Sequence, residues 1–317
     1  MNIKAIILLS IIVSLAQRAN CRGRWKLLWR DEFKRLDKNK WSHMTGDGCE
    51  FGICGWGNNE HQYYTKSKRN AYVEAGRLIL KARKETGSNL RSLQKFCEKR
   101  CGSDRGCKNK CQGVQISSAR LRSLNKFSIS PGYKGYDAIK ITVKVKVMPG
   151  EGIWPAIWML PDSGNNSCSG CGKYGIWAQS GEIDIFEAVN NMEEAIGTIH
   201  YGGSWPENLS WGSKVSITPK QWSKISLIWR KDSIEWYLNS NLFHRVHSGR
   251  GTRNGWFSSS RKAATYSPFD EKFHLLLNVA VGGGLTGNVP MERALSTLES
   301  SSKTMHIDYI RVYGLKE

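Results

Sequence analysis

Beyond its first 21 residues, the 317-residue sequence has no apolar run long enough to cross a bilayer, which takes about 20 residues. It also lacks a proline- or serine-rich linker, an internal repeat and a low-complexity tract. The motifs of helix-turn-helix, zinc-finger and RNA-binding domains are missing as well. These absences argue against a membrane protein, a repeat protein and a nucleic-acid-binding protein.

Acidic residues are scarce, with 27 Asp and Glu against 47 Lys and Arg, so the formal net charge is +20 at pH 7. A field of this sign attracts polyanions such as anionic glycans or bacterial surfaces. Because no nucleic-acid-binding motif accompanies the charge, nucleic acid is not an expected partner. Two interpretations stay open: a surface that keeps the protein soluble, or a contact with a polyanionic partner.

The first 21 residues have the pattern of a secretory signal peptide. Lys4 supplies a positive charge, and a mainly apolar stretch follows over positions 5–16. Cleavage is predicted after Ala16 or after Cys21, and an uncleaved signal anchor is the alternative. We therefore expect a secreted, extracellular monomer that does not bind membranes, with residues 22–317 forming one domain.

Nine cysteines in a secreted chain predict disulfides with one cysteine left over, and Cys21 is the candidate for the odd one. The other eight fall in local groups. Two of these groups place cysteines four residues apart, one helical turn, which predicts a short helical hairpin closed by two disulfides. A zinc site is the alternative, but secretion favours disulfides. The predicted pairs are Cys49–Cys54, Cys97–Cys111, Cys101–Cys107 and Cys168–Cys171.

The stretch from Gly181 to Glu187 (GEIDIFE) places three carboxylates in an apolar, strand-forming run. Alternate residues of a strand share a face, so Glu182 and Asp184 point the same way. Glu187 would point to the other face, but a β-bulge around Ile185–Phe186 returns it to the carboxylate face. We therefore expect three crowded acids on one surface.

Crowded like charges raise at least one pKa, and the protons then belong to the set. A use that fits is glycoside hydrolysis with retention, which needs two carboxyl groups about 5–5.5 Å apart. In this hypothesis Glu182 is the nucleophile, Glu187 is the acid and then the base, and Asp184 orients Glu182 and tunes its proton affinity. A strand with solvent-exposed acids, or a cation site, is the alternative.

The flanking sequence resembles glycoside hydrolase family 16. Glu182–Glu187 is similar to the bulged form of the family signature, and the segments Trp154–Pro161 and Gly197–Gly202 resemble its neighbours in order and spacing. The resemblance runs from Trp29–Phe33 to Ile307–Tyr313. Within the family, the chain looks most like the endo-β-1,3-glucanases (laminarinases) and the related invertebrate β-1,3-glucan-binding proteins.

The resemblance, together with many short alternating strands, implies an all-β fold: a concanavalin-like jelly-roll sandwich of two curved antiparallel sheets with a concave substrate cleft. It implies a retaining endo-hydrolase whose partner is a β-1,3-glucan of the laminarin type and whose catalysis needs no cofactor. The alternative is a non-catalytic β-1,3-glucan recognition protein of innate immunity. Such binders generally lack the catalytic acids, and all three acids are present here.

Five further residues are assigned to the cleft by the resemblance. Trp154 and Trp158 lie four apart on one strand face and can stack on sugar rings, although core packing is the ordinary role of tryptophan. His200 is expected to hydrogen-bond either the acid/base carboxyl or the glucan. Asn58 is expected at the cleft, with a backbone-supporting turn residue as its alternative, and Arg120 is expected to face the cleft.

Residues 84–114 form an insertion that the usual family pattern lacks. Between Arg83 and Cys111 there are nine basic and three acidic residues, a net charge of +6. The insertion is either an accessory element that meets a polyanionic surface or a solvated decoration. The chain also has Leu285-Thr286-Gly287 where relatives usually carry Trp-Pro-Gly, so an aromatic contact at the cleft is expected to be missing.

Two accessory predictions concern the surface. The resemblance implies a structural Ca²⁺ held by the backbone carbonyls of Glu32 and Gly76 and by the Asp308 carboxylate, and oxygen ligands from separate strands suit this ion. Two Asn-X-Ser sequons, at Asn165 and Asn208, permit N-glycosylation of a secreted chain.

Overall fold

The computed structural model describes residues 23–162, 168–252 and 255–317. The predicted signal peptide with both cleavage positions, and the sequon at Asn165, lie outside the described residues. Within the described part of the chain, no helix combines the length and apolar character that a membrane crossing needs.

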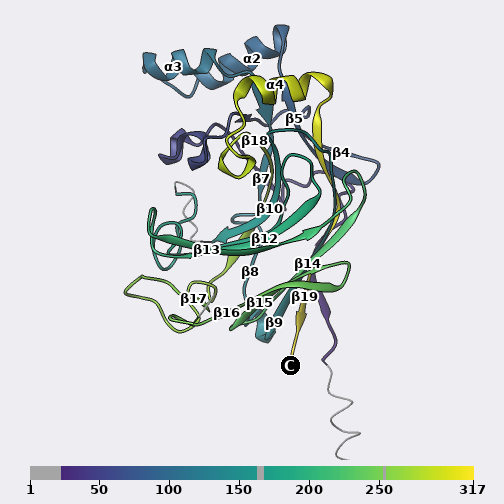
Figure 1. Ribbon diagram of the computed structural model, residues 1–317, viewed down its shortest axis with the longest axis vertical. Helices are drawn as coiled ribbons and strands as arrows, with labels where there is room; N and C mark the ends of the chain where they lie inside the picture. Colours follow the sequence, from purple (N-terminus) through teal and green to yellow (C-terminus); the bar gives the residue numbers. More distant parts are fainter. Residues whose placement is uncertain (1–22, 163–167, 253–254) are drawn as a thin grey trace, which may run out of the picture.

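Two sheets form the body of the molecule (Figure 1). Nearly all neighbouring strands are antiparallel, as the alternating apolar pattern predicts for sheets with one face in the core. The first sheet has 11 strands. They are β1 (Lys26–Asp31), β3 (Tyr63–Tyr64), β4 (Ala71–Glu74), β5 (Arg77–Lys84), β6 (Ile116–Ser118), β9 (Ala138–Val147), β14 (Ser223–Trp229), β15 (Ser233–Leu238), β16 (Asn241–Ser248), β17 (Gly255–Trp256) and β19 (Lys303–Leu315).

The second sheet has eight strands and carries the candidate catalytic residues. Its central order is β12-β11-β10-β18-β7, so the predicted acidic strand β11 lies between β12 and the tryptophan-bearing strand β10. Its strands are β2 (Ser42–Met44), β7 (Arg120–Arg122), β8 (Ser128–Ile129), β10 (Ile153–Pro161), β11 (Glu182–Glu187), β12 (Glu194–Gly202), β13 (Asn208–Ser216) and β18 (Phe273–Val281). The predicted two-sheet jelly roll is thereby confirmed.

The core fills the space between the two sheets. On β9 every second side chain, from Ile139 to Val147, is buried, while Lys140, Lys144 and Lys146 point to the outer face. The inward side chains join one continuous apolar cluster with those of β10, β11 and β18. Burial of this apolar surface is the main term that holds the two sheets together.

Trp236 ties the two sheets together directly beneath the acidic strand. This fully buried residue of β15 donates its indole N–H to the backbone carbonyl of Asp184 on β11, over 2.8 Å. Its ring packs against Gly197 of β12, where an added Cβ would lie 2.5 Å from the indole Cδ1. The glycine therefore makes room for the ring that supports the backbone of β11.

Gly197→Ala tests this support. The new methyl group must displace the Trp236 ring or shift β12, and overpacking of this kind costs about 1–3 kcal/mol. We expect the free energy of unfolding in guanidinium chloride to fall by that amount. Gly284→Ala serves as a control, because a Cβ there meets no atom within 4 Å and its φ lies outside the left-handed region. Equal stability of Gly197→Ala and wild type would contradict the packing described.

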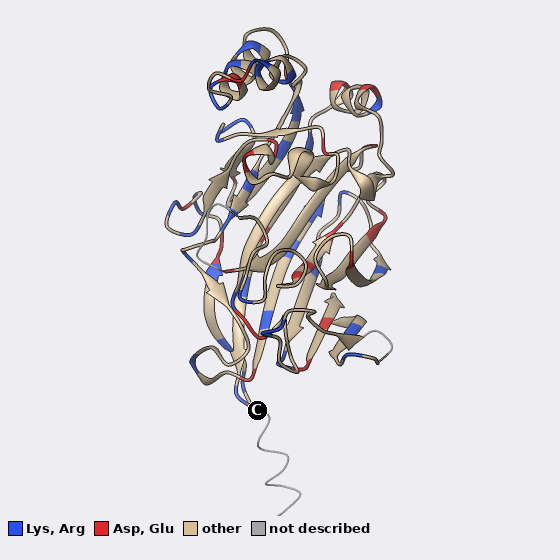
Figure 2. Ribbon diagram, turned by 90° about the vertical axis from the view of Figure 1, so that its left-hand side faces the viewer, with Lys and Arg blue, Asp and Glu red and all other residues tan. Residues whose placement is uncertain are grey.

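Three α-helices and four 3₁₀ turns complete the described structure. The helices are α2 (Gly87–Glu98), α3 (Arg105–Gln112) and α4 (Met291–Ser300), and the turns are η1 (Cys49–Phe51), η2 (Cys54–Gly57), η3 (Tyr133–Gly135) and η4 (Gly284–Thr286). Helices α2 and α3 form the predicted hairpin and lie with α4 at one end of the sandwich (Figure 1). Figure 2 shows basic residues along much of this hairpin.

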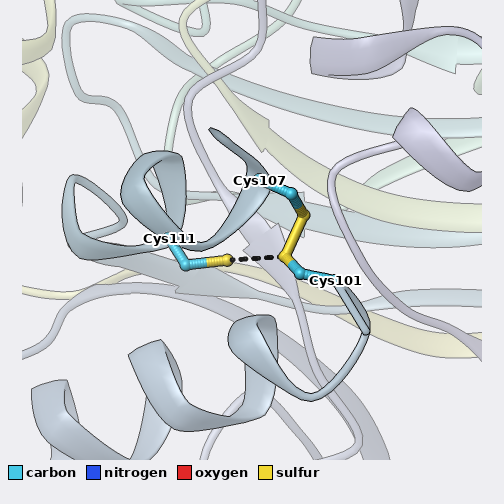
Figure 3. Close-up of side chains that lie close together, drawn as sticks. All are labelled: Cys101, Cys107 and Cys111. Carbon is cyan, nitrogen blue, oxygen red and sulfur yellow. Dashed lines mark hydrogen bonds between the residues drawn. A yellow bond between two sulfur atoms is a disulfide. The ribbon is translucent and has the colours of Figure 1, made fainter. Parts of the chain in front are cut away.

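All four predicted disulfides are present: Cys49–Cys54, Cys97–Cys111, Cys101–Cys107 and Cys168–Cys171. Figure 3 shows Cys111 beside the Cys101–Cys107 bond, with Sγ of Cys111 3.6 Å from Sγ of Cys101. These sulfurs lie close enough to suggest a metal site. Because each is bonded to another sulfur, none is a thiolate ligand, so the zinc alternative is wrong for this hairpin.

Candidate active site

Strand β11 brings the three predicted carboxylates to one surface. Glu182 pairs with His200 and Asp184 with Thr198 on β12, and the register then shifts before Glu187 pairs with Ile196. This shift is the predicted β-bulge. It turns both Ile185 and Phe186 into the core. The bulge therefore returns Glu187 to the face that carries the other two acids.

Each glutamate receives a hydrogen bond from a tryptophan. Nε1 of Trp177 donates to Oε2 of Glu182 over 2.7 Å, and Nε1 of Trp154 donates to Oε1 of Glu187 over 2.9 Å. Asp184, between them in sequence, is 2% exposed, and Glu187 is 8% exposed. The alternative of three solvent-exposed acids is therefore wrong, because Asp184 and Glu187 are buried and Glu182 is partly buried.

Burial raises the pKa of all three carboxyl groups, and the Asp184 charge raises the pKa of both glutamates further. The pKa of Glu182 reaches about 8 and that of Asp184 about 7. The pKa of Glu187 lies well above its usual range. Groups this close titrate together, so the set shares protons at neutral pH. A protonated Glu187 is suited to donate a proton to a leaving group.

His200 lies beside Asp184. Its Nε2 is 3.3 Å from Oδ2 of Asp184, and its ring packs against Trp177 at a centroid distance of 5.5 Å. The predicted hydrogen bond between His200 and Glu187 is therefore wrong, because β12 pairs His200 with the other end of the acidic strand. Contact of His200 with glucan stays a prediction.

The second predicted tryptophan, Trp158, is half-buried and donates its indole N–H to Oδ1 of Asn278 over 2.7 Å. Arg120 lies between two indole rings, 4.2 Å from the centroid of Trp56 and 4.7 Å from that of Trp158. A buried guanidinium between two aromatic faces is held rigidly by cation–π contacts. Arg120 also lies within electrostatic reach of Glu60 and Glu182, and its contact with a substrate stays a prediction.

Asn58 marks the rim of this surface. Its side-chain amide donates to Oε1 of Glu60 over 3.3 Å, and its carbonyl accepts from Gly284 over 3.0 Å. A Cβ on Gly283 would lie 3.1 Å from both the Asn58 carbonyl and the Trp154 ring, so η4 packs against both residues. Leu285 stands exposed on η4, in the segment where the resemblance led us to expect that an aromatic contact is missing.

Three residues that sequence reasoning missed complete the site. They are Glu60, Trp177 and Asn278, which contact Asn58, Glu182 and Trp158 respectively. Glu60 also accepts hydrogen bonds from Gln62 and Tyr64. The one available signal was the acid in Asn58-Asn59-Glu60-His61-Gln62. Trp177 comes from an irregular segment between a disulfide and β11, where no periodicity indicates which way a side chain points.

The predicted calcium site fits poorly with the side chains around it. The Asp308 carboxylate lies 2.8 Å from Nζ of Lys144, and the Glu32 carboxylate accepts two hydrogen bonds from Arg311. A calcium ion would have to compete with an ammonium group for the one carboxylate of the predicted set. Calcium binding stays a prediction, and no step of the chemistry below depends on it.

The acidic surface itself offers a second geometry for a cation. One ligand atom each from Glu182, Asp184 and His200 lies within 4.8 Å of the others. This arrangement alone does not separate a cation site from a pair of catalytic carboxylates. The placement of Glu187 on the same face, with its pKa raised and a tryptophan donor of its own, is what favours acid–base chemistry.

A sandwich of two antiparallel sheets with paired glutamates on a bulged central strand defines a glycoside hydrolase. A family model described as "XgeA-like, catalytic GH16 domain" matches residues 107–225. The catalytic domain of an endo-1,3-beta-glucanase (laminarinase) from Thermotoga petrophila RKU-1 superimposes with a TM-score of 0.67 at 31% identity, covering 93% of this chain and 100% of that one. The chain belongs to glycoside hydrolase family 16.

Two curated relatives agree with this assignment. "Glucan endo-1,3-beta-glucosidase A1" of Niallia circulans is 33% identical over 297 residues, which is 90% of this chain and 37% of the relative. "Beta-glucanase" of Rhodothermus marinus is 28% identical over 320 residues, 96% of this chain and 92% of the relative. The chain thus spans about a third of the first relative and nearly all of the second.

The proton sharing predicts a specific pH effect of Asp184→Asn. With Glu187 in its predicted role as the general acid, kcat/KM should fall as pH rises through the pKa of that group. Asp184 raises this pKa by its charge. Its replacement by Asn lowers the pKa of Glu187, and the alkaline limb of the pH profile moves to lower pH.

The matched control is Asp232→Asn, the same change on an exposed turn between β14 and β15. Its alkaline limb should coincide with that of wild type. An unmoved limb in Asp184→Asn would contradict the electrostatic coupling of these acids.

Proposed function

We propose that the protein is a secreted endo-hydrolase that cleaves β-1,3-glucan with retention of anomeric configuration. The observation that carries this proposal is the bulge in β11, which brings Glu187 to the face of Glu182 and gives each glutamate its own tryptophan donor. The names of the relatives supply the substrate class. The four disulfides fit an oxidising compartment and support secretion.

In the first step, the Glu182 carboxylate attacks the anomeric carbon while Glu187 gives its proton to the leaving glycosidic oxygen. The departing chain leaves as an alcohol, and Glu182 is left as a glycosyl ester. Glu187, now ionised, takes a proton from water as that water attacks the anomeric carbon and the ester bond breaks, which releases Glu182 as a carboxylate. Two displacements at one carbon retain its configuration.

Both His200 and the hydrogen bond from Trp177 act on Glu182. Each lowers the pKa of Glu182 and so opposes the effect of burial. They stabilise the ionised form that attack requires. Asp184 shares a proton with its neighbours, which allows one carboxyl to be protonated while another carries charge.

The cleft surface provides the sugar contacts. Trp154 and Trp158 are both half-buried on strand β10, with their N–H groups engaged by Glu187 and Asn278. Their hydrogen bonds fix the orientation of the rings, so that a ring face can stack on the C–H face of a sugar without a further loss of side-chain freedom.

The test is release of reducing sugar from laminarin, with and without a chelator, followed by sizing of the products. Hydrolysis in both conditions with intermediate-sized oligosaccharides first is the expected result, since internal cleavage needs no metal in this mechanism. Binding of laminarin without hydrolysis would favour a recognition protein. Loss of activity with the chelator would show that a metal is required, either at Glu182, Asp184 and His200 or at the predicted calcium site.

A further inference from the structure

A cavity of about 350 Å³ lies outside the acidic cleft, between helix α2 and the edge of the 11-stranded sheet. The loop between β3 and β4, the end of β5, strand β6 and helix α2 all contribute to its lining. Its volume falls within the range of small-molecule sites, about 300–1,000 Å³. Helix α2 of the insertion at 84–114 thus covers one side of this cavity, which the two sheets alone would not form.

One short strand separates this cavity from the cleft. Successive residues of a strand point to opposite sides. On β3, the Tyr64 hydroxyl donates to Glu60 in the cleft, whereas the Tyr63 ring packs edge-on against Phe96 of α2 at 5.9 Å. Because Phe96 lines the cavity, the two sites lie on opposite sides of β3.

A buried carboxylate faces this cavity. Glu85 is 5% exposed, and its Oε1 accepts from the Ser117 hydroxyl over 2.6 Å. Its Oε2 lies 3.0 Å from a guanidinium nitrogen of Arg69 but receives no hydrogen bond of good geometry from a described residue. This oxygen therefore keeps the capacity to accept one more hydrogen bond, from water or from a hydroxyl group of a bound molecule.

Helix α2 presents a mixed face to the same cavity. Asn89, Ser92, Leu93 and Phe96 follow the spacing of one helical face, and all four line the hollow. The face offers an amide, a hydroxyl and an aromatic ring within two turns. Sugars combine apolar C–H faces with hydroxyl groups that both donate and accept, which matches an aromatic ring beside such polar groups.

Three cations and one carboxylate surround the cavity, and the carboxylate is what selects a hydroxyl group. Lys66 and Arg69 line the cavity with Glu85, and Arg83 places its Nε 3.8 Å from the same carboxylate. A sulfate or carboxylate group in the cavity would meet the Glu85 charge, whereas a hydroxyl group can donate to Glu85 and accept from Arg69.

We propose that this cavity is a second carbohydrate site, which binds a glucosyl unit of a β-glucan chain outside the catalytic cleft. The identity of the glycan rests on the proposed function. Two sites on one enzyme hold a polymer more tightly than either site alone, but a short oligosaccharide gains nothing from the second. The cavity therefore raises affinity for polymeric substrate.

The test compares Ser92→Trp, which fills the cavity, with Ser103→Trp, the same change in the exposed turn between α2 and α3. For Ser92→Trp we expect KM for laminarin to rise about tenfold, with kcat for laminarin and kcat/KM for laminaritetraose unchanged. Ser103→Trp should match wild type. Equal KM values for laminarin in all three proteins would overturn the proposal.

Glu85→Gln is the second variant, with its melting temperature measured by circular dichroism because Glu85 is buried. A folded Glu85→Gln protein should also bind laminarin more weakly. Isothermal titration of Glu182→Gln with laminarihexaose should show two sites, and one site once Ser92→Trp is added. Binding of dextran sulfate in place of laminarihexaose at the site that Ser92→Trp removes would overturn the assignment to a neutral sugar.

The same measurements separate this proposal from the proposed function. Laminarin hydrolysis with no effect of Ser92→Trp would leave the function standing and remove the second site. A wild-type protein that binds laminarihexaose at the cavity and hydrolyses no β-glucan would keep the second site and remove the hydrolase.

Discussion

Glu182→Gln will lower kcat on laminarin by at least about 10⁴-fold, the scale of loss when a nucleophile is removed. The amide keeps the size of the side chain and can still lie beside the Trp177 indole, but it cannot form the glycosyl ester. The substitution replaces a partly exposed group, so the fold should be retained. The measurement is reducing-sugar release, with circular dichroism to confirm folding.

The control for this variant is Glu207→Gln, the same change at an exposed position outside the described cleft contacts. It should hydrolyse laminarin at the wild-type rate. A small anion such as azide should restore product formation in Glu182→Ala, because it can enter the space of the missing carboxylate and attack from the same side. Wild-type activity in Glu182→Gln would remove Glu182 as nucleophile.

Glu187→Gln will lower kcat on laminarin by about 10²- to 10⁴-fold, which is the usual contribution of a general acid. The amide cannot give a proton to the departing sugar, whose alcohol is a poor leaving group. An aryl β-glucoside with a nitrophenolate leaving group needs no such proton. With that substrate the first displacement should stay fast, and the glycosyl-enzyme should accumulate because the base for the second step is missing.

A burst of nitrophenolate followed by a slow steady state is therefore the signature of Glu187→Gln. Equal losses with laminarin and with the aryl glycoside would argue that Glu187 is structural. Glu187 also accepts a hydrogen bond from Trp154, so a structural role must be separated from a catalytic one. The amide of Glu187→Gln keeps an oxygen that can accept from the same indole, so this variant removes the proton donor and leaves the structural contact.

Local geometry explains which features were predictable from the sequence. Cysteines spaced four apart lie on one helical face, so the pairs Cys97–Cys111 and Cys101–Cys107 follow from spacing alone. The bulge was predictable because only an extra residue in β11 brings Glu187 to the side of Asp184. In both cases the partners are close in sequence or belong to one element.

Contacts between distant segments were not predictable in the same way. The position of His200 depends on the register of β12 against β11, and a sequence indicates a strand more readily than its register. The placement of Arg120 between Trp56 and Trp158 joins three separate segments. The ion pair of Lys144 with Asp308 likewise arises between neighbouring strands and disfavours the expected calcium.

The cavity beneath α2 shows a further limit of sequence reasoning. The insertion stood out by its charge and its cysteines, and both features direct attention to its surface. Phe96 of α2 and the buried Glu85 line the same cavity only because α2 packs over the edge of the sheet. Apolar and polar side chains from separate elements line this cavity, so no single stretch of the sequence predicts it.

Covalent trapping tests the central claim most directly. A laminaribioside with fluorine at C2 and a dinitrophenolate leaving group slows both displacements but allows the first to proceed, so the glycosyl-enzyme persists. After peptic digestion, mass spectrometry should find the fluoroglycosyl group on the peptide that contains Glu182, bonded to that residue. A label on Glu187, or turnover of laminarin by a protein that forms no adduct, would contradict the double-displacement mechanism proposed for this chain.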